Sequence, residues 1–275
     1  MIRRLRNDKK AVSPAISTAI ITMAIVSMLL VTVLFANNYL NAQLAQNEFN
    51  SMEQFMQTVG LQVDDVSWTV GRTQTFRYAS KFGQVNFQSA ALNYALYVNS
   101  TNTWVANFTT GALFFNMPIV DYNLGNNYTA LISPTSYTSF LQQGTSAPIC
   151  HVFAIERVPM NDGSFIRVVV SPSIRMLNST IGTTSYCNFY LPILQSSGNN
   201  LYLTQSVTLL ATAFNVQTVQ NINAITITVN FLKSASGFDS TFFDFNSSLV
   251  NMQVPSGSSL DFYTGNVTVS LGVYV

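Results

Sequence analysis

The stretch AVSPAISTAIITMAIVSMLLVTVLFA, residues 11–36, decides how this chain is built. Its 26 residues carry no charge, and as an α-helix they would extend about 39 Å at ~1.5 Å per residue, enough to cross the ~30 Å apolar core of a bilayer. The ten residues before it hold five of the chain's twelve Lys and Arg residues. Because basic residues beside an apolar segment stay on the cytoplasmic side, we expect the N-terminus inside the cell and residues 37–275 outside.

Glycine and proline are almost absent from residues 13–59, which predicts one long helix. Ser13 fits the N-cap and Pro14 the first helical position, where a missing N–H costs nothing. Gly60 is the first glycine of the chain and is a natural C-terminal stop. We therefore expect a helix over residues 12–59 that ends at Gly60.

The predicted helix has two parts. Residues 12–36 are apolar on every side, as expected for a segment surrounded by lipid or by sister helices. Residues 37–59 are amphipathic, with apolar residues at steps of three and four. That apolar stripe requires a partner surface, most simply the chain's own C-terminal part. The stripe consists of Ala45, Phe49, Met52, Met56 and Val59.

From Gly60 onward the apolar pattern changes to a period of two, which is typical of β-strands. Residues 63–70 and 73–80 read as a hairpin joined at Gly71-Arg72. Residues 150–159 and 164–170 flank Asn161-Asp162-Gly163, the clearest hairpin signal in the chain. We also expect strands at residues 224–232 and 266–275. The fold class is thus α+β, a long hydrophobic N-terminal helix followed by a β-rich, sandwich-like head domain at residues 60–275, in one lobe or two.

The composition excludes some classes of partner. Charged residues make up 8% of the chain, against about 25% in an average soluble domain. Without the first eleven residues, seven Lys and Arg remain against ten Asp and Glu, a formal charge of −3. So few basic residues form no phosphate-binding stripe, and we expect no nucleic-acid partner. A weakly charged, apolar surface instead suits a subunit that packs against copies of itself.

The junction Lys10-Ala11-Val12-Ser13-Pro14 resembles the start of archaeal type IV pilins and pilin-like surface filament proteins, which carry a class III signal peptide. In that family a membrane-bound prepilin-type leader peptidase removes a short basic leader in front of the hydrophobic segment. The resemblance implies a cleaved leader at residues 1–11, with cleavage-site residues Lys10, Ala11 and Val12. It covers residues 1–59. Bacterial type IV pilins carry a Glu at the fifth mature position, whereas this chain has Ile16 there, or Ala15 if the cut follows Lys10. Archaeal relatives often lack this Glu, so the resemblance to the archaeal family holds.

The resemblance also implies how the protein would assemble. Before assembly it would sit in the cytoplasmic membrane, and a pilus assembly ATPase and membrane platform would build it into an extracellular homopolymer. The helix-core residues that would hold this polymer together are large and aliphatic: Ile16, Ile20, Ile21, Ile25, Leu29, Leu30, Val33 and Leu34.

The chain has two cysteines, Cys150 and Cys187, and one histidine, His151. Outside the cell an even pair of cysteines favours a disulfide, with two buried thiols as the alternative. One histidine and two cysteines lack the usual close ligand spacings, so we expect no metal site.

No catalytic or cofactor motif is present: the sequence has no G-x-S-x-G, H-E-x-x-H, phosphate-binding loop or dinucleotide fingerprint. We therefore expect neither an enzyme nor a bound cofactor. Six Asn-x-Ser/Thr sequons are candidates for N-glycosylation once exported. They are Asn99, Asn107, Asn127, Asn178, Asn246 and Asn266.

Two functions agree with these features. The first is a structural subunit of an archaeal type IV pilus-like filament on the cell surface, with a role in adhesion or surface attachment. The second is a membrane-anchored surface binding protein or adhesin that keeps the same helix as a permanent single transmembrane anchor.

Overall fold

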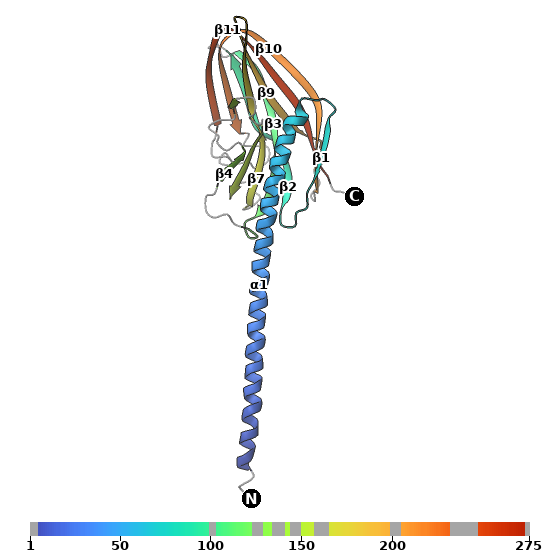
Figure 1. The fold of residues 1–275 in the computed structure, drawn as a ribbon, viewed down its shortest axis with the longest axis vertical. Helices are drawn as coiled ribbons and strands as arrows, with labels where there is room; N and C mark the ends of the chain where they lie inside the picture. The colour runs from blue at the N-terminus through green and yellow to red at the C-terminus, as the bar shows by residue number, and fades with distance from the viewer. Residues whose placement is uncertain are drawn as a thin grey trace. The chain divides into compact units, whose positions relative to one another are not determined.

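The computed structural model describes residues 5–98, 103–122, 129–133, 141–143, 150–156, 165–198, 205–231 and 247–272. It divides into two compact units, Met1–Asn47 and Glu48–Val275. Helix α1 spans Leu5–Ser67, and eleven strands follow it in the described residues (Figure 1). The strands are β1 (Thr73–Arg77), β2 (Gln84–Val98), β3 (Thr103–Pro118), β4 (Thr129–Ser133), β5 (Leu141–Gln143), β6 (Cys150–Glu156), β7 (Phe165–Pro172), β8 (Ile174–Ile181), β9 (Thr184–Ser196), β10 (Ser206–Phe231) and β11 (Ser247–Gly272).

The predicted long N-terminal helix and the β-rich domain after it are confirmed, but α1 is longer at both ends than expected. It begins at Leu5 and contains Pro14, so the predicted start at Ser13 is wrong for the uncut chain. At the other end α1 passes through Gly60 and ends at Ser67, so the predicted stop is also wrong.

The helix continues past Gly60 because its apolar stripe continues. Val63 and Val66 extend the alternating steps of three and four that begin at Phe49, and both are buried. Burying a Val side chain is worth about 1.5–3 kcal/mol, more than the roughly 1 kcal/mol that a helical glycine costs. The predicted hairpin of residues 63–70 and 73–80 is therefore wrong. Residues 63–67 are helical, and β1 pairs with β10 instead.

The strands form one hydrogen-bonded sheet in the order β4-β6-β7-β3-β2-β10-β11-β9-β8-β5, with β1 added beside β10. The predicted antiparallel pairing of residues 150–159 with 164–170 is confirmed as β6 with β7, while its turn lies outside the described residues. Residues 224–231 lie in β10, and residues 266–272 lie in β11 between β10 and β9. The β9–β11 pairing is parallel.

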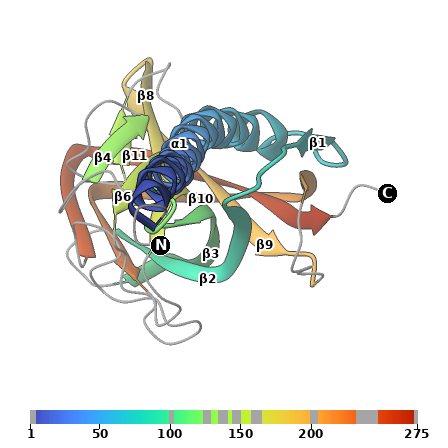
Figure 2. The same ribbon diagram turned by 90° about the horizontal axis from the view of Figure 1, so that it is seen from below.

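The sheet curls back on itself, so that strands far apart in its order touch (Figure 2). On β3, Thr110 Oγ1 accepts a hydrogen bond from the backbone N–H of Leu194 on β9 at 2.9 Å. The enclosed face holds the main core, built from alternate residues of the strands. Its largest members include Tyr94, Phe114, Phe189 and Phe262.

The opposite face of the sheet carries a second buried layer, which residues 49–67 of α1 cover. Leu113, Phe115 and Met117 are buried on β3 and alternate with Phe114 of the main core, so they face the other side. The ring centroids of Phe49 and Phe115 are 6.4 Å apart. From residue 49 onward, the partner surface that we predicted for the amphipathic stripe is thus this outer face of the sheet.

The C-terminal end of α1 is fixed to the sheet by close backbone packing. A Cβ added to Gly265 on β11 would lie 2.3 Å from the carbonyl oxygen of Ser67, so only glycine lets the helix end approach this strand. Trp68 follows directly, and its ring meets Tyr190 edge-on at 5.4 Å and Phe214 at 6.1 Å.

Polar contacts tie the same end of α1 in place. Asp64 accepts a hydrogen bond from Trp68 Nε1 at 2.8 Å and lies 3.6 Å from Arg175 of β8. Asp65 forms an ion pair with Arg72. The two neighbouring carboxylates therefore pair with different basic residues, Asp64 with Arg175 and Asp65 with Arg72.

At the start of the second unit, Glu48 is held by a loop. Its carboxylate accepts hydrogen bonds from the backbone N–H groups of Lys81 (2.8 Å), Phe82 (2.9 Å) and Gly83 (3.2 Å) and from the Ser80 hydroxyl. Successive N–H groups that point to one spot form a concave anion site, and the carboxylate occupies it. Glu48 thus joins α1 to the loop between β1 and β2.

Replacing Glu48 by Gln should destabilise the protein, because an amide cannot accept from all four donors. Hydrogen bonds to a charged group are worth about 1.5–3 kcal/mol each, and we expect a loss of about 2 kcal/mol in the free energy of unfolding. Denaturant unfolding of the full chain in detergent, followed by circular dichroism, measures it. An unchanged midpoint would show that the loop does not depend on this carboxylate.

Glu53, five residues further along α1, provides a comparison for which we expect a change in stability of the opposite sign. Burial raises the pKa of Glu53 above its ordinary value of 4.5. The folded state then binds the proton more tightly than the unfolded state, so stability falls as the pH rises from about 4.5 through the raised pKa. Glu53→Gln should therefore stabilise the chain at pH 7 and lose this gain below about pH 4.5. A gain of equal size at pH 4 and pH 7 would exclude this explanation.

Candidate self-assembly surface

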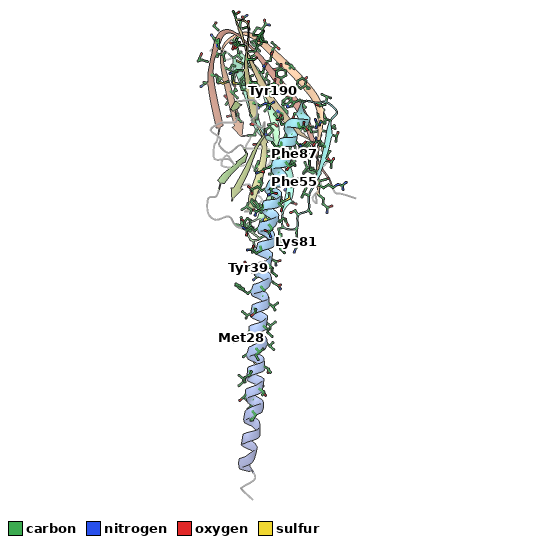
Figure 3. The ribbon with its side chains drawn as sticks, in the orientation of Figure 1. Met28, Tyr39, Phe55, Lys81, Phe87 and Tyr190 are labelled. Carbon is green, nitrogen blue, oxygen red and sulfur yellow. The ribbon has the colours of Figure 1, made fainter. Side chains whose placement is uncertain are left out.

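The largest exposed apolar surface of the described chain lies on α1. Every residue from 16 to 44 is exposed, and none of them is charged. The predicted helix-core residues all belong to it, with exposed fractions from 52% at Ile25 to 63% at Ile20 and Leu34. Met28 and Tyr39 also point away from the helix (Figure 3). The eight predicted residues are Ile16, Ile20, Ile21, Ile25, Leu29, Leu30, Val33 and Leu34.

The hydroxyl groups on this part of α1 bond within the helix itself. Thr22 donates to the carbonyl oxygens of Thr18 and Ala19 at 2.9 Å, Ser27 to Met23 at 2.8 Å, and Thr32 to Met28 at 2.8 Å. A hydroxyl that donates to a carbonyl oxygen in the preceding helical turn needs no hydrogen-bond partner from outside the helix. The part of this surface at residues 16–36 can therefore enter a fully apolar environment, of lipid or of protein, while the hydroxyls of Thr22, Ser27 and Thr32 keep their hydrogen bonds.

The apolar part of α1 is long and apolar enough to cross a membrane. A charged residue lies on each side of this part: after Lys10, the next charged residue is Glu48. Lys10, Ala11 and Val12 lie on α1 by their backbone, and their side chains are outside the described residues. Whether a peptidase cuts there stays a prediction.

The predicted disulfide between Cys150 and Cys187 is not formed in this structure, where Cys187 is a free, buried thiol. Cys187 lies in the main core, and its strand neighbours are Leu260 and Asn178. Cys150 lies on β6 opposite Pro172, and its side chain is outside the described residues. The two strands are not neighbours in the sheet order, and the even number of cysteines on which the prediction rested does not indicate which strands lie together.

Burial raises the pKa of the Cys187 thiol, which keeps it protonated and unreactive. It lines a pocket with Met176 and Met252. Within the described part of the chain, no three His, Cys, Asp or Glu side chains gather as metal ligands do. The side chain of His151 lies outside that part.

The structure places three of the six candidate glycosylation sites. Asn107 on β3 and Asn178 on β8 are exposed, and Asn266 on β11 is half-buried between paired strands. Asn107 accepts a hydrogen bond from the Asn93 side chain at 2.6 Å. The side-chain surroundings of Asn99, Asn127 and Asn246 lie outside the described residues. Asn107 and Asn178 are thus the exposed sequons among those described, and glycosylation itself stays a prediction.

Sequence reasoning missed one candidate surface, the outer face of the sheet beyond the end of α1. There Tyr190 and Tyr263 stack with ring centroids 4.7 Å apart, and Phe214 stacks on Tyr263 at 6.0 Å. Burial, Asp261 and Tyr190 together raise the pKa of Tyr263. No local motif marks this stack, because its members come from three strands.

Comparisons with protein-family models, with curated proteins and with solved structures found no match to this chain.

Proposed function

We propose that this protein is the structural subunit of a pilin-like filament on the cell surface, polymerising through the apolar part of α1. One observation carries the proposal: residues 16–36 form a helix surface that is apolar on all sides, and in the described chain every residue from 16 to 44 is exposed. An exposed apolar surface of this extent needs a partner. Sister helices provide one that remains available when the protein leaves the membrane.

The apolar surface supports packing against identical helices. Small residues recur along it, and such residues let helix backbones approach closely. Large aliphatic side chains lie between them and would fill the spaces of a helix bundle. The small residues include Ala15, Ser17, Thr18, Ala19, Thr22, Ser27 and Thr32.

Removal of the leader is the step that would permit assembly. Five basic residues at the N-terminus hold this end of the chain on the cytoplasmic side. Pro14 has no N–H, so the carbonyl of Lys10 lacks the hydrogen bond that residue i+4 donates elsewhere in a helix. This weakens α1 beside the predicted cut. Cleavage next to Ala11 would also bring Pro14 into the first helical turn, where proline is tolerated best.

The same helix could instead serve as a permanent anchor of a surface binding protein. Its length and composition suit a membrane span. The two functions differ in processing: an anchor keeps its basic leader, whereas a filament subunit loses it. Blocking the cut therefore separates them.

A variant with Lys10→Gln and Ala11→Trp places bulk at the predicted cut and removes one charge. We expect it to stay in the membrane fraction with its full leader and to form no filaments, as judged by electron microscopy of sheared cell surfaces. Arg3→Gln, the control, removes the same charge away from the cut and should assemble normally. Normal filaments from the blocked variant would contradict the proposal.

A further inference from the structure

In the described chain, one side of β10 has no strand partner between Ala211 and Ile225, a stretch that includes the seven regular residues 213–219. On that side β1 pairs with residues 206–210 and β2 pairs with residues 225–231. Ala211 also exchanges backbone hydrogen bonds with Gly71 and Arg72. Between these two neighbours, residues 213–219 run in unbroken register with β11 on the other side. No strand of the described chain pairs with their free side.

The open segment is exposed as well as unpaired. None of its residues is buried, and Phe214 and Val216 are 40% and 47% exposed. Exposed edge strands usually carry a Lys, a Pro or a bulge that prevents another strand from adding. Residues 213–219, AFNVQTV, contain no charge, no Pro and no Gly. An uncharged seven-residue segment of this kind readily pairs with another strand.

The segment is self-complementary when it is read in reverse. In an antiparallel pair of two copies centred on Val216, Phe214 faces Thr218 and Val216 faces itself on one side of the sheet. On the other side Asn215 faces Gln217, so that their amides can hydrogen-bond. No like charges meet at any row of the pair.

The flanks of the segment leave room for such a pair. The register of β10 shifts between Ala211 and Ala213, and again between Val219 and Ile222, where Asn221 has a φ of 59°. Such irregularities bend a strand. They bracket the seven regular residues symmetrically about Val216, so β1 and β2 lie beyond both ends of the pairing segment.

We propose that two copies of this chain join edge to edge through residues 213–219 of β10, antiparallel and centred on Val216. The pair merges the sheets of two second units into one. The contact is separate from the apolar helix and does not rest on the proposed filament. In a filament it would connect neighbouring subunits or neighbouring filaments, and in an anchored protein it would form a dimer.

Cysteine cross-linking of the full chain in detergent tests the register. Residues directly opposite in an antiparallel pair have Cβ atoms about 4.5–5.5 Å apart, so Val216→Cys should oxidise to a covalent dimer. Gln220→Cys is the control on the same strand. In the proposed pair two Cys at 220 lie eight residues apart, about 26 Å at ~3.3 Å per residue. We expect at least tenfold more dimer at 216 than at 220, with the native chain as the baseline for Cys150 and Cys187.

Mixed copies test the direction of the pair. Phe214→Cys chains and Thr218→Cys chains should cross-link when mixed and not when alone. Adding Val216→Lys to both places two ammonium groups face to face and should reduce this cross-link at least tenfold, while the melting temperature stays unchanged because the site is on the surface. Equal dimer yields at 216 and 220, or a mixed cross-link that survives Val216→Lys, would overturn the proposal.

Discussion

The packing of the apolar stripe of α1 on the outer face of the sheet is the interaction on which the second unit depends. From Phe49 to Val66 this stripe lies on the outer face of the sheet, where Phe49 meets Phe115 of β3 and the helix ends beside Gly265 of β11, and large apolar side chains on that face are buried. The curled sheet can enclose only one of its faces, and α1 supplies the cover for the other. The close approach of Ser67 to Gly265 and the carboxylate of Glu48 in its loop fix the two ends of this contact.

The apolar part of α1 likewise requires a partner that covers its apolar side chains. Residues 49–66 are amphipathic because one side has a sheet to pack on and the other side faces water. Residues 16–36 are apolar on all sides and are exposed on all sides in the chain alone. A helix of that kind is stable only among lipids or among other helices. Both candidate functions satisfy this requirement, and only the filament does so outside the membrane.

Much of this architecture could be predicted from the sequence, because helices and strands leave local patterns. The uncharged run, the change to an amphipathic stripe and the alternation around Val267 and Val269 each depend on neighbouring residues only. The end of α1 could not be placed, because the burial of Val63 and Val66 outweighs the local signal of Gly60. The pairing partners of the strands could not be predicted either. Alternation of apolar and polar residues shows which side chains of a strand share a face, but it does not show which strand lies beside it. The Glu48 loop, the aromatic stack and the open edge of β10 all arise from residues far apart in the sequence.

The N-terminal residue and the size of the native protein together distinguish a filament subunit from a membrane anchor. For a filament subunit, we expect that protein sheared from the cell surface sediments as a large assembly and that mass spectrometry of its N-terminal peptide shows a chain beginning at Val12. A chain that begins at Met1 and leaves the membrane only in detergent would contradict it and would establish the helix as a permanent anchor.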